Sequence, residues 1–423
     1  MIKFILVTVV LVFWLFYIYR KKKSLIYPST FLLLIYVVSV ALAYPHVIIN
    51  NETLSLKPEY FQASLFFLLL IFVYFSPFLL FREDRIMKIV LPNAKLLYNF
   101  SIIIVVLSLF SVIYFLPVVI NVFQMGDLNF ARNNMVEGNL YVSETIFNTI
   151  ASVSASLYTI AMILFFIYKA LGTNKVLSNL LLISSTSYVF NVFAYVGRDG
   201  VVFWIFSFLG VYGLFKNFLP KNDIKKIKKI ILYFTIIAVP FFLAITFDRF
   251  AENPFAGILS YVGQPFPNFC LFYNIDRPIT YGSSFPLFRE ILGLKIIESE
   301  MWMEGGTVSW VFGTFLKTLL SNFGRFGTLF TGIILGSIFL LIIKINSKTL
   351  YFHQLFVYYL YFMLFAQGVF YFRQITRGGN LFIILSFVFY FLFLFIRKNH
   401  NINSLVLYSK SYTNKSNNET TTH

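Results

Sequence analysis

The stretch IKFILVTVVLVFWLFYIY, residues 2–19, is almost entirely apolar and is followed at once by RKKK at 20–23. A helix that rises about 1.5 Å per residue needs about 20 such residues to cross a hydrocarbon core roughly 30 Å thick. Basic residues that flank a span typically remain on the cytoplasmic side. Because no small-residue cleavage site follows the apolar run, we interpret it as an uncleaved anchor with its N-terminus outside.

The composition of the whole chain also indicates a membrane protein. Hydrophobic residues make up 59% and charged residues 12% of the 423 residues, against about 45–50% and about 25% in soluble domains. So few charges cannot cover a water-soluble surface. The composition therefore predicts an all-α, polytopic transmembrane helical bundle.

Continuous apolar runs predict eleven spans. They lie at about 2–19, 26–44, 61–81, 96–119, 146–168, 176–196, 200–218, 230–247, 326–343, 354–372 and 379–396. With the N-terminus outside, the C-terminus is cytoplasmic. The inner segments then hold 22 of the 34 basic residues and only 4 of the 17 acidic ones. The positive-inside rule thus explains the net charge of +17, which does not indicate nucleic acid.

Two regions are expected outside the bundle. Residues 248–325 form a large extracytoplasmic loop, rich in Gly, Pro and aromatic residues, and loops of this length are usually functional. Residues 399–423 are rich in Ser, Asn, Thr and Lys and are expected to form a disordered cytoplasmic tail. The membrane domain would therefore span 1–398.

Arginine replaces lysine on the outer side. The inner segments hold 18 Lys and 4 Arg, whereas the outer segments hold 4 Lys and 8 Arg. Guanidinium binds phosphate bidentately and stacks on sugars and aromatic rings. The pattern predicts an anionic ligand at the outer face, such as a lipid phosphate or pyrophosphate. Pairing of each arginine with a local acid or with lipid headgroups remains the alternative.

Two places stand out among the outer arginines. Arg373 and Arg377 have no acid within 371–380, and in a continuous helix their i,i+4 spacing would put both on one face, where an anion would offset their repulsion. Arg198 lies in the Gly-Arg-Asp-Gly turn at 197–200, where an ion pair with Asp199 is as good an explanation as a functional role.

The absent motifs exclude several classes of protein. A single cysteine, four scattered histidines and the lack of any Asp-x-Asp, Walker or GxGxxG motif predict neither a metal site nor a cofactor. No ionisable residue lies in the middle of a predicted span, and this disfavours ion-coupled transporters and channels.

Four short stretches carry a family resemblance. They are YVGRDG (195–200), ITYGSSF (279–285), SNFGRFGT (321–328) leading into GIILG (332–336), and FRQITRG (372–378). Together with the spans and the large outer loop they resemble the Wzy-type polymerases of O-antigen and capsule repeat units. The similarity covers about residues 90–396.

The resemblance implies a metal-independent, GT-C-like glycosyltransferase of the bacterial inner (cytoplasmic) membrane. Its donor and acceptor would be undecaprenyl-pyrophosphate-linked oligosaccharides at the outer face, and its partners would be membrane lipids and a chain-length regulator protein. By this analogy Arg198, Arg373 and Arg377 contact the pyrophosphate, with Arg249, Arg277 and Arg289 as second-rank contacts. The unranked candidates for the base are Asp199, Asp248, Asp276 and Glu290, and Tyr281 could stack on a sugar.

Two alternatives remain. An O-antigen ligase would need a catalytic histidine in the large outer loop, and 248–325 contains none. A lipid-linked oligosaccharide flippase or other transporter would need polar or charged groups along the membrane interior. The sequence favours the polymerase over both.

Overall fold

The computed structural model describes residues 2–49, 60–125, 130–131, 145–197, 199–249, 254–274, 279–295, 303–304, 307–308, 312–399 and 404–410. The chain divides into two compact units. The first comprises Met1–Asp84, Glu252–Ser347 and Leu360–Ile384, and the second comprises Arg85–Ala251, Lys348–Tyr359 and Leu385–His423.

The first unit is built mainly of helices. They are α1 (Ile2–Lys22), α2 (Pro28–Ile49), α3 (Tyr60–Leu80), α12 (Pro254–Gly263), α13 (Pro265–Asn274), α14 (Pro286–Ile291) and α15 (Thr314–Ile342). A two-stranded hairpin, β2 (Met303–Glu304) and β3 (Thr307–Val308), and the 3-10 turn η3 (Arg373–Ile375) accompany them. The unit also takes in the end of α16 (Phe352–Gln367) and the start of α17 (Arg377–Asn399).

The second unit contains the middle of the chain. Its helices are α4 (Ala94–Gln124), α6 (Ile146–Ala155), α7 (Tyr158–Leu171), α8 (Lys175–Ser184), α9 (Ser187–Ala194), α10 (Asp199–Phe215) and α11 (Lys221–Arg249). The strands β1 (Lys88–Val90), β4 (Thr349–Tyr351) and β5 (Val406–Tyr408) complete it, and the short turn η2 (Glu83–Arg85) precedes β1.

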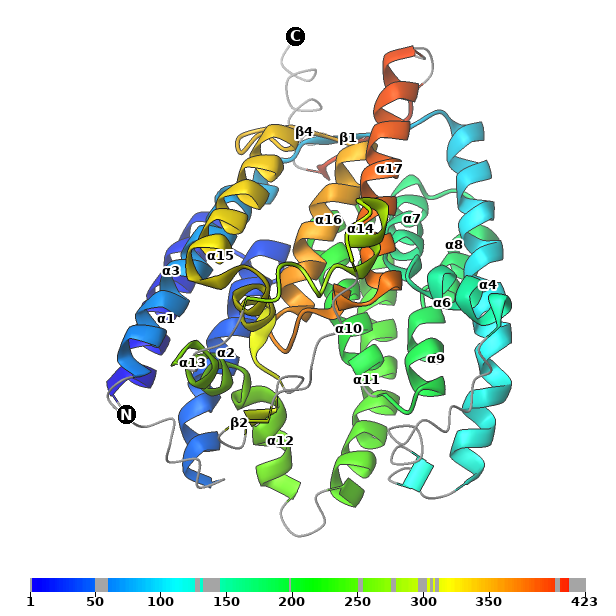
Figure 1. The fold of residues 1–423 in the computed structure, drawn as a ribbon. Coiled ribbons are helices and arrows are strands. Elements are labelled where there is room, and N and C mark those ends of the chain that lie inside the picture. Colours follow the sequence, from blue (N-terminus) through cyan, green and yellow to red (C-terminus); the bar gives the residue numbers. More distant parts are fainter. Residues whose placement is uncertain are drawn as a thin grey trace. The chain divides into compact units, whose positions relative to one another are not determined.

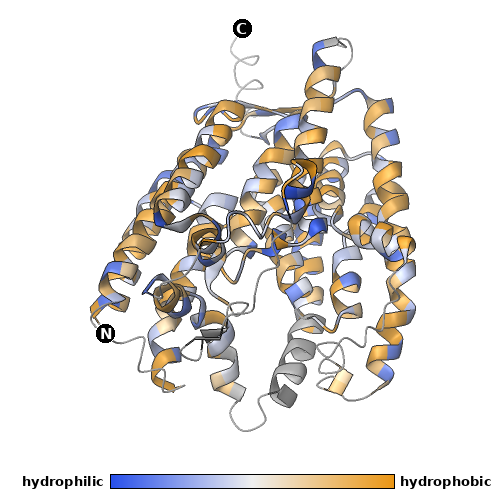
Figure 2. Cartoon of the chain, viewed as in Figure 1, coloured by the Kyte–Doolittle hydropathy of each residue, from blue (hydrophilic) through white to orange (hydrophobic). Residues whose placement is uncertain are grey.

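The helices confirm a multi-pass membrane protein. Within the described residues, seven helices are long and apolar enough to cross a membrane, and an eighth span results if α6 and α7, bent by 43°, count as one. Most of their residues are hydrophobic (Figure 2). Helices α10, α11 and α16 occupy the other predicted spans. The count of eleven and the orientation remain predictions.

Two predicted spans of the second unit are broken in the middle. Helix α6 gives way to α7, and α8 to α9, across two residues each. At the first break the Ser156 hydroxyl donates to the carbonyl of Val153 at 2.6 Å, and at the second Ser185 does the same for Leu182 at 2.6 Å. A break frees carbonyls that lipid cannot satisfy. The serine at each breakpoint gives one of the carbonyls there a hydroxyl donor.

In the first unit, α15 packs along α3 (Figure 1). A methyl group on Gly332 would lie 2.7 Å from the Tyr74 ring, so only glycine lets the two helices approach this closely. The Tyr74 hydroxyl donates to the carbonyl of Thr328 at 2.7 Å, and Tyr361 donates to the carbonyl of Tyr74 at 2.5 Å. The GIILG stretch therefore has a packing role.

The tail was predicted to be disordered, and for 404–410 that prediction is wrong. Strand β5 pairs antiparallel with β1, whose other edge pairs in parallel with β4. The middle residue of each strand, Ile89, Leu350 and Leu407, is buried, so the apolar side chains of one face hold the sheet together. Residues 400–403 and 411–423 lie outside the described part of the chain.

A buried ion pair joins three helices at one end of the first unit. The Lys22 ammonium donates to Glu83 at 2.5 Å, and also to the Ser29 hydroxyl at 2.6 Å and the Phe81 carbonyl at 2.5 Å. The other oxygen of Glu83 accepts the Ser29 backbone N–H at 3.1 Å, in the first turn of α2. All three ammonium protons thus have acceptors, and the carboxylate caps a helix N-terminus.

We expect Lys22→Ala to destabilise the protein by about 3–5 kcal/mol, because it leaves a buried carboxylate without its partner. Unfolding in detergent by heat or denaturant measures the change. Lys21→Ala, at an exposed neighbour, is the matched control and should change stability by less than about 0.5 kcal/mol. The double variant Lys22→Met/Glu83→Leu should recover most of the loss. If Lys22→Ala and Lys21→Ala lowered the stability equally, the Lys22–Glu83 ion pair would not be what holds the three helices together.

Candidate functional site

One buried asparagine fixes the segment 279–295 to α15 within the first unit. Asn322 is fully buried, and its Oδ1 accepts the Ser284 N–H at 3.0 Å. Its Nδ2 donates to the Ser284 hydroxyl at 2.8 Å and to the carbonyl of Thr318 at 2.6 Å. The Thr280 N–H adds a bond of 3.0 Å to the carbonyl of Ser321. Two backbone N–H groups of this irregular segment therefore find acceptors in α15, one in the Asn322 side chain and one in a backbone carbonyl.

A second buried asparagine attaches the segment before α17 to the same place. The Oδ1 of Asn380 accepts the Leu287 N–H at 3.1 Å, and its Nδ2 donates to the carbonyls of Gln374 at 2.6 Å and Ser284 at 3.4 Å. Gly379 makes this approach possible, since a methyl group there would lie 2.5 Å from the Gln374 Cα atom.

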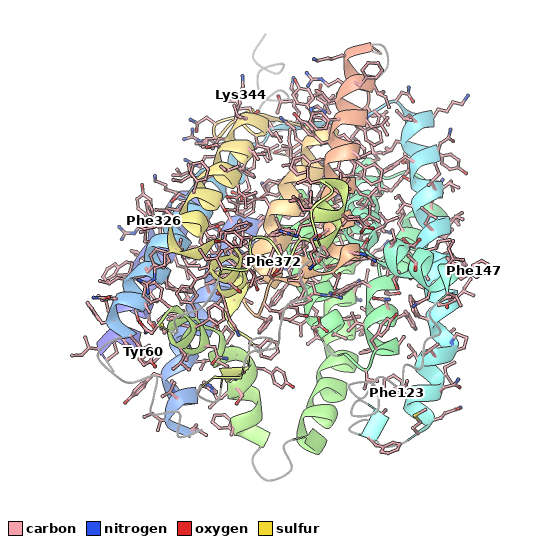
Figure 3. All side chains as sticks on the ribbon, viewed as in Figure 1. Tyr60, Phe123, Phe147, Phe326, Lys344 and Phe372 are labelled. Atoms are coloured by element: carbon pink, nitrogen blue, oxygen red, sulfur yellow. The ribbon has the colours of Figure 1, made fainter. Side chains whose placement is uncertain are left out.

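These contacts bring together three of the four stretches that carry the family resemblance: 279–285, 321–328 and 372–378. Aromatic rings fill the space between them. Phe285 lies 6.0 Å from Phe323 and 5.5 Å from Phe372 (labelled in Figure 3), between ring centroids. The fourth stretch, 195–200, belongs to the second unit.

Arg373 and Arg377 do not share a helix, so the expected i,i+4 face is wrong. Arg373 begins the turn η3, Thr376 is extended with φ −88° and ψ 162°, and α17 starts only at Arg377. The Thr376 hydroxyl accepts the Gly379 N–H at 3.1 Å. This capping bond starts a new helix where the sequence pattern suggested a continuous one.

Arg377 instead faces an acid from the large loop. Its guanidinium lies 3.3 Å from a carboxylate oxygen of Glu290, and both side chains are more than half exposed, at 62% and 52%. An exposed pair of this kind stabilises the fold only slightly. Both groups therefore remain available to a ligand at little cost in stability.

The Arg289 guanidinium forms hydrogen bonds within its own loop. Its Nε donates to the carbonyl of Lys295 at 2.8 Å, and its Nη1 donates to the carbonyl of Tyr281 at 2.5 Å. Tyr281 has a positive φ of 44°, and its side chain is exposed. In this conformation Arg289 closes the loop and leaves the ring of Tyr281 at the surface.

The remaining predicted residues lie in the second unit, outside the described residues, or in the segment before α17. Asp199 is the first residue of α10 in the second unit. The side chains of Asp248 and Arg249, and residues Arg198, Asp276 and Arg277, lie outside the part that the structure describes. Arg373 belongs to the same segment as Gln374 and is partly buried.

Sequence reasoning missed the polar residues that build the site. Asn322, Asn380 and Gln374 are all at least nine-tenths buried. The available signal was polarity itself, because an amide or ammonium group close to an apolar span is costly unless it has a role. Among the described residues no group of three His, Cys, Asp or Glu side chains could hold a metal ion.

No protein-family model, no curated protein and no solved structure matches this chain.

We expect Asn322→Leu to release the loop 279–295 from α15. The substitution removes the acceptor of the Ser284 N–H and the donor to its hydroxyl, and an unsatisfied buried group costs about 1–3 kcal/mol. Trypsin should then cut faster after Arg289 and Lys295, as followed by mass spectrometry. Thr331→Val is the control, because the Thr331 hydroxyl donates within α15, to the carbonyl of Gly327. Equal cleavage rates in the two variants would contradict the role of Asn322.

The single cysteine should be unreactive. Cys270 is buried in α13, its Sγ 3.7 Å from the Ser64 hydroxyl, and burial raises the pKa of the thiol to about 12. The thiolate is therefore scarce at pH 8. A maleimide should leave the folded protein unlabelled at pH 8 and label it fully after denaturation. Lys295→Cys, at an exposed position, is the reactive control. Rapid labelling of the folded wild type would refute the burial of Cys270.

Proposed function

We propose that this protein is a polysaccharide polymerase of the outer face of the bacterial cytoplasmic membrane. It joins undecaprenyl-pyrophosphate-linked oligosaccharide repeat units into O-antigen or capsular polysaccharide, as a metal-independent glycosyltransferase. The eleven spans and the outward N-terminus belong to this proposal, because they put 279–295 and 373–377 on the outer side.

One observation carries the proposal. Three separate stretches that resemble the polymerase family meet around Asn322 and Asn380, although up to about a hundred residues separate them in the chain. Such convergence is expected if the stretches form a common site, and it has no obvious cause if each resemblance arose by chance. Exposed charge gathers at the same place, as the pair Arg377–Glu290.

The chemistry of repeat-unit transfer needs an anion clamp and a base. The acceptor hydroxyl attacks the anomeric carbon of the donor, the new C–O bond forms, and the bond from that carbon to the pyrophosphate oxygen breaks. The electron pair leaves with the pyrophosphate, where cationic groups stabilise the developing charge. The proton of the hydroxyl passes to a carboxylate.

Arg377 and Glu290 are suited to these two tasks. Arg377 offers a guanidinium for the leaving pyrophosphate, and Glu290, 3.3 Å from it, offers a carboxylate for the acceptor proton. Of the four candidate acids, Glu290 is therefore the one with a geometric argument in its favour.

The test uses surface glycan made in a strain that lacks the chromosomal gene. We expect Arg377→Ala and Arg373→Ala to abolish long-chain glycan and to leave single repeat units, because loss of one contact to a developing charge slows a reaction about 10²–10³-fold. Glu290→Gln should give the same pattern if Glu290 is the base. Gel electrophoresis of the glycan separates the products.

Lys295→Ala is the matched control. Lys295 is also a basic residue of the first unit on the proposed outer side, its side chain is exposed, and it lies outside the three stretches that meet at the site. This variant should make a normal ladder. Normal ladders from Arg373→Ala and Arg377→Ala as well would rule out the proposed clamp.

A further inference from the structure

Helix α11 of the second unit begins with a dense group of lysines. The stretch KNDIKKIKKI, residues 221–230, holds five lysines and a single acid, Asp223. All five lysine side chains are exposed, and none forms an ion pair, a hydrogen bond or a ring contact with a described residue. They are Lys221, Lys225, Lys226, Lys228 and Lys229. Like charges three or four residues apart on a helix repel each other, and no partner within the described chain relieves that repulsion.

The lysines lie on the side of α11 that faces away from the neighbouring helix. With 3.6 residues per turn they occupy an arc of about 160° around the helix axis. Ile227, which is 1% exposed, and Phe234 lie on the opposite side. The Phe234 ring stacks on Trp204 of α10, with 4.1 Å between ring centroids. One side of α11 therefore packs within the second unit, and the lysine side is open to a partner from outside the chain.

The character of this open side changes within a single turn. Lys225 and Lys229 are followed on the same stripe by Leu232 and Ile236, which are 55% and 58% exposed, and Tyr233 beside them is 59% exposed. The helix rises only about 4.5 Å from Lys229 to Leu232. Exposed ammonium groups thus give way to exposed hydrocarbon, with a tyrosine at the boundary. This order is typical of a helix that crosses from the headgroup level of a bilayer into its acyl chains.

One kind of partner fits both halves of the stripe. A soluble acidic protein or a nucleic acid would balance the lysines but would leave Leu232, Tyr233 and Ile236 exposed to water. A zwitterionic lipid would cover these apolar side chains but would bring no net charge to the lysines. An anionic phospholipid does both, because its phosphate lies at the headgroup level directly above its own acyl chains. Lysines next to a membrane surface attract such lipids.

We propose that residues 221–236 of α11 form a binding site for anionic phospholipids. Lys225, Lys228 and Lys229 hold the headgroup phosphates, and Leu232 and Ile236 contact the acyl chains. The site requires the lysines to act together on one kind of headgroup, which goes beyond the retention of positive charge on one side of the membrane. It does not depend on the proposed polymerase activity, because no residue of 221–236 belongs to the candidate site.

Thermal unfolding of the purified full-length protein in dodecyl maltoside tests the site. Dioleoylphosphatidylglycerol is the anionic probe, and dioleoylphosphatidylcholine is the neutral comparison with the same acyl chains. The anionic lipid should raise the melting temperature at a lower concentration than the neutral one, since a ligand that binds only the folded state stabilises it. The variant Lys225→Gln/Lys228→Gln/Lys229→Gln should weaken the apparent affinity for the anionic lipid about tenfold or more and leave that for the neutral lipid unchanged.

The variant Lys88→Gln/Lys95→Gln/Lys175→Gln is the matched control. It removes three exposed lysines of the same unit that lie on three different elements, β1, α4 and α8. The net charge falls equally while the group on α11 stays intact, so this variant should respond like the wild type. Arginine at positions 225, 228 and 229 keeps the charge and should keep the response.

Three outcomes would overturn the proposal. The first is an equal loss of affinity in the α11 variant and in the control, and the second is no preference of the wild type for the anionic lipid. The third is binding of glycerol 1-phosphate as tightly as of the anionic lipid, because it would assign the lysines to a soluble phosphate.

Fluorescent labels test the boundary on α11 without reference to affinity. Because Cys270 is buried, Lys226→Cys and Ile236→Cys can each be labelled selectively in nanodiscs of phosphatidylglycerol. Acrylamide in the water should quench the label at 226, and lipid with brominated acyl chains should quench the label at 236. Equal quenching of both labels by acrylamide would show that the apolar part of the stripe faces water, and the lipid site would then be wrong.

Discussion

Each backbone N–H and C=O that leaves a helix and is buried away from water must find its partner inside the protein. The candidate site depends on that constraint. Asn322 and Asn380 are buried, and between them they serve the backbone of the large loop, of α15 and of the segment before α17. An amide can do this because it carries both a donor and an acceptor. Serine and threonine do the same at the helix breaks of the second unit.

The sequence was informative about helices and much less so about the large loop. Long apolar runs identify a span directly, because burial of one kind of surface dominates the energy there. Proline was the misleading signal. In 248–325 it suggested irregular structure, but Pro254, Pro265 and Pro286 are the first residues of α12, α13 and α14. Proline is favoured at that position, where its missing N–H costs nothing.

The roles assigned to the candidate site residues stay predictions. Among these residues, Arg377 contacts Glu290, and Arg289 donates to the carbonyl of Tyr281. The prediction that Arg373 and Arg377 share a helical face was wrong. The Thr376 hydroxyl caps a new helix between them, so the four-residue spacing does not fall within one helix. Helix α15 begins twelve residues before the predicted span, at 314 rather than 326. Helix boundaries depend on tertiary contacts such as that of Thr314 with Phe370, which no local pattern contains.

The small sheet of the second unit has a consequence for the order of assembly. Strand β1 is made early, but β4 and β5, which occupy its two edges, leave the ribosome only after nearly all the helices. Until then the edges of β1 are open to other chains, as exposed strands generally are. Pairing between segments so distant in the chain is also slow. Completion of the sheet thus depends on the last part of the chain to be synthesised, so a ribosome that stalls before Val406 would leave one edge of β1 unpaired.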